Sequence, residues 1–232
     1  MNPADPADLA VLIPAWNEAQ NLQALLPALW DVIGGLGVSA EIIVIDAGST
    51  DGTPQVAARF GARAIRQTEP GYGGALLAGF AAARAPYLVT MDADLSHRPV
   101  FIEEFWNRRT QAEVLIASRY MPGGRSQTHW FRRLLSVILN QTYSRLLALP
   151  LRDVSSGFRM YRRDVVANLE LLARDFDVLE EILIRIYKQG WRILEVPFHF
   201  MPRRTGRSHV RLLRFAWAYL KTLWRMWRLR RA

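Results

Sequence analysis

Short runs of strand-like composition alternate with longer stretches of helical periodicity along the first half of the chain. Aliphatic runs predict strands at residues 9–16, 40–46, 63–67, 86–95 and 112–120. The stretches between them predict helices at residues 17–37, 54–62, 71–85 and 99–111. This alternation predicts an α/β fold, with a mostly parallel sheet that is flanked by helices.

The pattern changes at residue 130. We expect a long amphipathic helix at 130–151, a turn, short strand and helix within 153–173, a helix at 177–190 and a strand at 191–201. A last helix is expected from about Ser208. We find no internal repeat, so the sequence predicts one domain over residues 1–207 and an amphipathic basic helix over residues 208–232.

The amino-acid composition is that of a globular domain without disulfides. The 232 residues are 50% hydrophobic, which provides ample material for a core, and they include no cysteine. Disulfides and thiolate metal sites are therefore excluded, which fits a reducing compartment. The start of the chain lacks the pattern of a signal peptide, and no apolar stretch is long enough for an ordinary transmembrane helix.

The formal net charge of +9 is concentrated at the end of the chain. Residues 203–232 contain ten Arg or Lys and no acidic residue, so the remaining chain has a net charge of −1. This asymmetry indicates an anionic partner, either a membrane or a nucleic acid.

The basic residues of the last segment share one helical face, flanked by Trp, Tyr, Phe and Leu. This arrangement predicts a helix that lies on a membrane surface. A helix packed on the body with a solvated basic edge is the alternative. The basic residues that form the stripe are Arg211, Arg214, Lys221, Arg225 and Arg228.

Two carboxylates follow the expected strand at 86–95. Asp92 and Asp94 are two residues apart, so they share a face if the strand continues to that point. Unpaired carboxylates so close repel each other, and a divalent cation removes the conflict. Carboxylate oxygens suit Mg²⁺ or Mn²⁺. A solvated loop with an Asp helix cap is the alternative.

Seven motifs occur in an order that carries a resemblance: VLIPAWNEAQNL, VIDAGSTDGT, GYGGALLAGF, TMDADLSH, IASRYMPGG, SSGFRMYRRD and RRTGRSH. Together they resemble the family 2 glycosyltransferases, which have a GT-A type, Rossmann-like fold. Within these, the chain is most similar to the dolichol- and polyprenol-phosphate mannose synthases. The resemblance covers roughly residues 9–210.

The resemblance implies an activity. It is the inverting transfer of a hexose, with mannose from GDP-mannose as the first expectation, to a polyprenyl or dolichyl monophosphate. The alternatives are a UDP-glucose-dependent glucosyltransferase with the same acceptor, and a family 2 enzyme with a non-lipid acceptor. A nucleic-acid-binding protein would leave the acidic pair and the ordered motifs unexplained, so no nucleic-acid partner is expected.

The resemblance also implies roles for individual residues. A nucleotide-sugar donor would be bound by Pro14, Glu18, Asp46, Asp51, Gly73 and Asp92, and the metal by Asp92 and Asp94. The acceptor phosphate would be bound by Arg119, Arg132 or Arg133, Ser156, Arg203 and His209. The catalytic set is Asp92, Asp94, Arg119 and Arg203. The structural alternatives are helix capping for Glu18, loop stabilisation for Asp51, helix packing for Gly73 and a plain turn for Ser156.

These roles define a mechanism and a location. A phosphate dianion needs no strong base, so the metal would neutralise the leaving nucleoside diphosphate while arginines hold the attacking phosphate. A single displacement inverts the anomeric carbon. We expect a peripheral enzyme on the cytoplasmic face of a membrane, with a membrane-protein partner as a further expectation, since many such synthases rely on one.

Overall fold

The computed structural model describes residues 7–201, 223–224 and 227–228. Its strands are β1 (Leu9–Ala15), β2 (Ala40–Asp46), β3 (Arg63–Arg66), β4 (Tyr87–Thr90), β5 (Val114–Ser118), β6 (Arg125–Ser126), β7 (Arg159–Arg162), β8 (Ile193–Pro197) and β9 (His199–Phe200). Its helices are α1 (Ala19–Leu36), α2 (Thr53–Arg59), α3 (Gly71–Ala82), α4 (Phe101–Arg108), α5 (Trp130–Leu147), α6 (Arg163–Val166) and α7 (Val178–Lys188).

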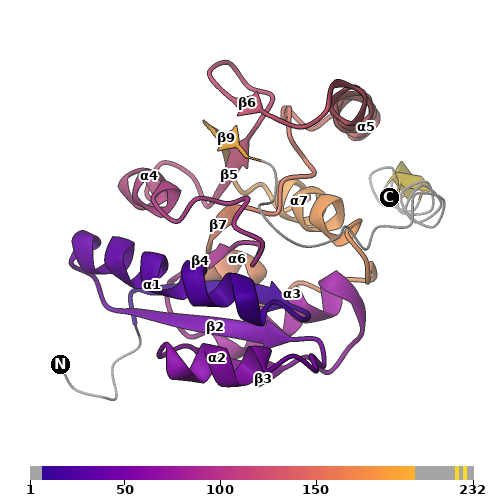
Figure 1. Ribbon diagram of the computed structural model, residues 1–232. Helices are drawn as coiled ribbons and strands as arrows, with labels where there is room; N and C mark the ends of the chain where they lie inside the picture. The colour runs from indigo at the N-terminus through magenta and orange to yellow at the C-terminus, as the bar shows by residue number, and fades with distance from the viewer. Residues whose placement is uncertain (1–6, 202–222, 225–226, 229–232) are drawn as a thin grey trace.

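Seven strands form one sheet in the order β3-β2-β1-β4-β7-β5-β8 (Figure 1). All neighbouring pairs are parallel except those of β7, which runs antiparallel to both β4 and β5. The short strands β6 and β9 pair with each other beside this sheet. The predicted α/β class with a mostly parallel sheet is therefore confirmed.

Alternation along the strands divides the core into two layers. In β1, Ala10 and Leu12 face a cluster that contains residues of α3, α5 and α7. Val11 and Ile13 face the opposite cluster, which contains residues of α1, α2 and α4. Because successive strand residues point to opposite faces, each aliphatic strand packs against helices on both sides.

Helix α1 illustrates how the sequence places one element. Its buried residues include Leu22, Leu25, Leu26, Leu29 and Ile33, whose spacing puts them on one helical face. The helix ends at Gly37, which adopts the left-handed conformation that glycine permits without a steric penalty.

Several expected elements differ from the structure. Strand β4 ends at Thr90, so Asp92 and Asp94 lie in the following loop and not on a strand face. The helix expected within 153–173 is only the four-residue α6, because most of residues 167–177 form an irregular segment. The strand expected at 191–201 divides into β8 and β9.

The expected C-terminal helix lies mostly outside the described residues. Residues 223–224 and 227–228 are helical, and Leu223 and Trp227 pack against the core cluster of α3, α5 and α7. The proposed boundary at residues 207/208 lies outside the described part. No helix within the described residues is long and apolar enough to cross a membrane.

Candidate active site

The carboxyl ends of β1, β2, β4 and β5 lie along one edge of the sheet, where open α/β sheets bind ligands. Pro14 is near the end of β1, and Asp46 ends β2. Asp92 and Asp94 follow β4, and Arg119 follows β5. The expected residues from four separate motifs are thus placed along one edge.

Asp46 organises the loop after β2. Its side chain is buried, and Oδ2 accepts hydrogen bonds from the backbone amides of Gly48 at 3.0 Å and Ser49 at 3.1 Å. A pocket of about 360 Å³ opens beside it. Its lining residues are Asp46, Gly48, Ser49, Pro54, Ala64, Ile65 and Arg66. The pocket offers a buried carboxylate and a guanidinium to a ligand of mixed polarity.

Asp51 holds the starts of two helices together. Its Oδ2 accepts a hydrogen bond from the backbone amide of Ala19 at 3.0 Å, and Oδ1 accepts one from the amide of Thr53 at 3.0 Å. The Thr53 hydroxyl also donates to Oδ1, at 2.5 Å, and accepts from the amide of Glu18. The contacts of Asp51 are those of the expected alternative, loop stabilisation.

The Asp51 contacts predict a dependence of stability on pH. Partial burial raises the pKa of Asp51. The hydrogen bonds from the Thr53 hydroxyl and from the amides of Ala19 and Thr53 lower this pKa by a larger amount, so that it lies below 3.8. A carboxyl group whose pKa is lowered by folding stabilises the fold at any pH above its pKa in the unfolded chain. This stabilisation is lost as the pH falls through the pKa of the folded state. We expect Asp51→Asn to flatten the fall of the melting temperature below about pH 4. Thermal denaturation between pH 2 and 7 measures this, and an unchanged acid limb would contradict it.

The loop after β4 presents the two carboxylates of the expected metal site. The Asp92 side chain is 33% exposed and the Asp94 residue is 5% exposed. The backbone amide of Ser96 donates to Asp94 Oδ1 at 3.0 Å. Leu95, between Asp94 and Ser96, has a φ of 64°, a left-handed conformation that is uncommon for residues other than glycine.

Two residues that sequence analysis missed contact Asp92. The Tyr72 hydroxyl of α3 donates to Asp92 Oδ1 at 3.3 Å, and desolvation together with the Asp92 charge raises the pKa of Tyr72 well above 10. The His97 Nδ1 accepts the Asp92 backbone amide at 3.0 Å, while its Nε2 lies 3.8 Å from Asp92 Oδ2. His97 also stacks on Phe158, with ring centroids 4.8 Å apart. The position of His97 five residues after Asp92, in the same motif, was the available signal.

The acidic pair provides few protein ligands. Across residues 7–201 and the described tail residues, no group of three His, Asp or Glu is placed to hold a metal ion. Two carboxylates in one loop fit a hard cation that takes its remaining oxygen ligands from a substrate.

Gly73 lies in the first turn of α3 against another backbone segment. Its amide donates to the carbonyl of Arg174 at 2.9 Å. The buried Glu181 side chain fixes this segment. Its carboxylate accepts hydrogen bonds from the backbone amides of Leu172 at 3.0 Å and Ala173 at 2.7 Å. The structure therefore uses Gly73 for close helix packing, and its amide is already engaged by the protein.

A side chain at position 73 would disrupt this packing. A Cβ atom there would lie 2.6 Å from the carbonyl oxygen of Ala173, well inside van der Waals contact. We expect Gly73→Ala to lower the free energy of unfolding by about 1–3 kcal/mol. Urea denaturation measures the change. Gly34→Ala is the control, since a Cβ there meets nothing within 4 Å and a glycine inside a helix is itself unfavourable.

Arg119 forms a bidentate ion pair. Its Nε and Nη2 donate to the two carboxylate oxygens of Asp153 at 2.8 and 2.7 Å, and Asp153 is fully buried. The Glu195 carboxylate accepts hydrogen bonds from the Asp153 backbone amide at 2.8 Å and from the Ser118 hydroxyl at 2.7 Å. Burial raises the pKa of Glu195 despite these hydrogen bonds. Asn140 of α5 accepts the amides of Val154 and Ser155 and so anchors the same turn.

A basic pocket of about 640 Å³ opens between the segment after β5 and α5. Its basic lining residues are Arg119, Arg133, Arg145 and Arg152. Ser156 is buried in the neighbouring turn. Nothing is described of the Arg132 side chain, and Arg203 and His209 lie outside the described residues. Of the arginine candidates for the acceptor phosphate, the pocket thus brings together Arg119 and Arg133.

Comparison with known proteins decides the family. The model of "Glycosyl transferase family 2" matches residues 10–169, which extend from β1 to beyond α6. The chain belongs to glycosyltransferase family 2. The activity class expected from the motifs, glycosyl transfer, is therefore confirmed.

Relatives within family 2 include named mannosyltransferases. "Dolichol-phosphate mannosyltransferase" of Pyrococcus furiosus is 32% identical over 94% of this chain and 63% of that protein. "Polyprenol monophosphomannose synthase" of Mycolicibacterium smegmatis is 34% identical over 85% of this chain and 79% of that protein. The chain thus spans less than two thirds of the length of the Pyrococcus relative.

Similar solved structures confirm the GT-A type fold. Glucosyl-3-phosphoglycerate synthase from Mycobacterium tuberculosis, solved with Mn²⁺, UDP-glucose and phosphoglyceric acid, has a TM-score of 0.75 at 21% identity. That alignment covers 95% of this chain and 80% of the other. The same enzyme with Mg²⁺ and UDP has a TM-score of 0.74. At this identity, the likeness establishes the fold alone.

Proposed function

We propose that this family 2 enzyme transfers a hexose, preferentially mannose from GDP-mannose, to a polyprenyl monophosphate with inversion at the anomeric carbon. The observation that carries the proposal is the placement of an acidic pair after β4 and an arginine-lined pocket after β5, two strands of one sheet that only β7 separates. The similarity to two named polyprenol- and dolichol-phosphate mannosyltransferases supports it.

The donor would occupy the side of the site formed by β1, β2 and β4. The pocket beside Asp46 suits a nucleoside, because buried carboxylate oxygens accept hydrogen bonds from ribose hydroxyls or base N–H groups. Asp92 and Asp94 would hold Mg²⁺ or Mn²⁺, which the solved neighbours contain together with UDP. When bound, the metal supplies positive charge that stabilises the leaving nucleoside diphosphate.

The acceptor would approach from the side of β5 and α5. Its phosphate is mostly dianionic at neutral pH, since the second pKa of a phosphomonoester is about 6. Arg119 and Arg133 would hold this dianion in line for attack, and Arg203 is a further candidate outside the described residues. β7 separates the ends of β4 and β5 by two strand spacings, about 10 Å, which leaves room for the transferred sugar.

The acceptor lipid implies a location at a membrane. We propose that the enzyme works peripherally on the cytoplasmic face, with the basic segment 208–232 on the lipid surface. A membrane-protein partner is compatible with this arrangement. The contribution of segment 208–232 is testable by its deletion in a vesicle-binding assay.

A UDP-glucose donor is the second candidate. The observation that favours it is the binding of UDP-glucose by a solved neighbour of the same fold. The acceptor and the mechanism would be unchanged, because the arginine-lined pocket and the pocket beside Asp46 share no lining residue.

The test is a transfer assay with the purified full chain, Mg²⁺ or Mn²⁺, a short-chain polyprenyl phosphate and radiolabelled nucleotide sugars. We expect label to enter the lipid from GDP-mannose and to require the divalent metal. Transfer from UDP-glucose instead would establish the second candidate. A folded protein that labels no polyprenyl phosphate from any donor would overturn the proposed acceptor.

A further inference from the structure

Tyr72, in the first turn of α3, and Gly157, two residues before β7, meet at the side chain of Asp92. The Tyr72 hydroxyl donates a hydrogen bond to Asp92 Oδ1 at 3.3 Å. A Cβ atom at Gly157 would lie 2.9 Å from the Tyr72 hydroxyl oxygen and 3.8 Å from Asp92 Oδ1. The hydroxyl therefore occupies the space that a side chain at position 157 would need.

The loop that carries Asp92 and the turn that carries Gly157 are tied to each other by two further contacts. The Thr90 hydroxyl donates to the Gly157 carbonyl at 2.8 Å. The His97 ring accepts the Asp92 backbone amide at Nδ1, at 3.0 Å, and stacks on Phe158 with ring centroids 4.8 Å apart. Neither contact involves α3, so the loop and the turn should keep their positions when the hydroxyl of α3 is removed.

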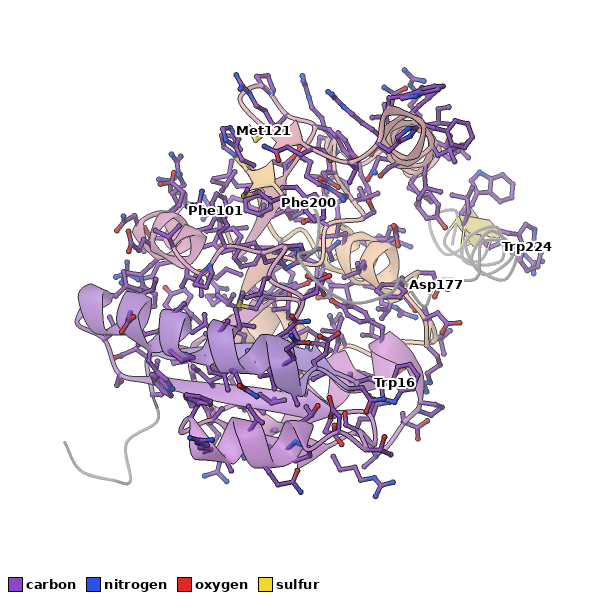
Figure 2. All side chains as sticks on the ribbon, in the orientation of Figure 1. Trp16, Phe101, Met121, Asp177, Phe200 and Trp224 are labelled. Carbon is purple, nitrogen blue, oxygen red and sulfur yellow. The ribbon has the colours of Figure 1, made fainter. Side chains whose placement is uncertain are left out.

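The Tyr72 ring is held from its other side by the segment before α7. It stacks on Phe176, with ring centroids 4.7 Å apart and an angle of 21° between the planes. The amide of the next residue, Gly73, donates to the carbonyl of Arg174 at 2.9 Å, which fixes the Tyr72 backbone against the same segment. Figure 2 shows Asp177, which follows Phe176, on the side of the molecule where α3 lies. The ring is thus fixed in a position from which its hydroxyl reaches the carboxylate.

The hydroxyl restrains the Asp92 carboxylate without neutralising it. Desolvation and the Asp92 charge raise the pKa of Tyr72 well above 10, so the phenol keeps its proton near neutral pH and acts as the donor. A neutral donor leaves the negative charge of Asp92 to a cation, and the side chain is 33% exposed. Hydrogen bonds from such outer groups orient ligating carboxylates, and their loss typically weakens metal binding about 10- to 100-fold.

We propose that Tyr72 is a positioning residue for Asp92, whose carboxylate it orients before a divalent cation binds. Gly157 is the position that leaves room for the hydroxyl. This role rests on the metal binding of Asp92 in the proposed function, and it names the group that sets the orientation of that ligand. Tyr72 acts through Asp92 and needs no contact with the substrate.

Tyr72→Phe removes the hydroxyl and keeps the ring that stacks on Phe176. We expect this variant of the full chain to bind Mn²⁺ about 10- to 100-fold more weakly, measured by electron paramagnetic resonance with GDP or UDP present. In the transfer assay, the Mn²⁺ concentration for half-maximal rate should rise, while kcat at saturating Mn²⁺ returns to the wild-type value. Tyr187→Phe is the matched control, because Tyr187 is 42% exposed on α7 and should leave both measurements unchanged.

Gly157→Ala tests the same contact from the opposite side. In the wild-type background the added methyl group displaces the hydroxyl, so we expect a lower melting temperature and weaker Mn²⁺ binding. In the Tyr72→Phe background the nearest atoms to this methyl group would be Asp92 Oδ1 and Leu179 Cδ1, both in ordinary contact at 3.8 Å. We therefore expect Gly157→Ala to have little further effect there on either measurement. Two independent structural roles would instead give additive losses.

The possible outcomes separate this role from the proposed function. Wild-type Mn²⁺ affinity in Tyr72→Phe, with the fold verified by circular dichroism, would overturn the positioning role alone, as would additive losses in the double variant. Wild-type protein that binds no Mn²⁺ with either nucleotide would overturn the positioning role together with the metal role of Asp92. Weaker Mn²⁺ binding by Tyr72→Phe, in a protein that transfers no sugar to polyprenyl phosphate, would refute the proposed acceptor and support the positioning role.

Discussion

Replacement of Asp94 by asparagine is expected to lower kcat by about 10²–10³-fold. The amide oxygen can still accept the hydrogen bond from the Ser96 amide, so the loop after β4 should retain its shape. The lost charge, however, removes half of the carboxylate pair that would hold the metal. The expected signature is a weaker response to Mn²⁺ or Mg²⁺ with an unchanged melting temperature.

The pH profile separates this role from that of a general base. In the proposed reaction the acceptor phosphate provides its own nucleophilic oxygen, so the acidic limb near pH 6 should persist in Asp94→Asn at a lower plateau. Asp164→Asn is the control, because the Asp164 side chain is 56% exposed and lies on α6. A less than tenfold loss in kcat with wild-type metal dependence would show that Asp94 does not bind the metal.

Removal of the Arg119 side chain is expected to have the largest effect on stability. Arg119→Ala leaves the fully buried Asp153 carboxylate without its guanidinium partner. Breaking a buried pair from one side typically costs about 3–5 kcal/mol. Chemical denaturation measures the loss. Arg108→Ala is the matched control, because its ion pair with Glu104 is exposed on both sides and should contribute less than about 1 kcal/mol.

A double replacement separates the structural role of Arg119 from phosphate binding. Arg119→Met with Asp153→Asn removes both charges, and we expect it to recover much of the lost stability. Sugar transfer should remain at least 10²-fold below wild type, because the guanidinium that we propose to bind the phosphate is still absent. If activity returned with stability, Arg119 would serve only to hold the turn at Asp153, and the acceptor site would need to be sought elsewhere in the basic pocket.

The parallel part of the sheet could be predicted from the sequence, because strands buried on both faces are continuous aliphatic runs. Ile42, Ile43, Val44 and Ile45 of β2 are all buried and all apolar. The end of β4 could not be predicted in this way. The pairing of β4 with β7 ends at Thr90, which lies opposite Arg159. Pairing between segments so far apart in the sequence leaves no local pattern that could be recognised.

Buried polar pairs were the least predictable part of the site. Arg119 was identified from its motif, but its pairing with Asp153 links residues 34 positions apart. Arg159 appears in the sequence as an ordinary basic residue, yet it is fully buried and donates to the carbonyls of Val154 and Leu179. Such contacts depend on how loops meet in three dimensions, which hydrophobic periodicity does not encode.

The antiparallel placement of β7 has a consequence for how this enzyme can evolve. The chain leaves the sheet after β5 and returns on the adjacent strand β7, so residues 119–158 form an excursion that carries α5 and most of the basic pocket. The carboxylates and the Asp46 pocket come from residues before 98. An excursion that starts and ends on neighbouring antiparallel strands can be lengthened or replaced while the strand order is kept. Selection can therefore alter the part that is proposed to meet the acceptor without rebuilding the part that is proposed to meet the donor.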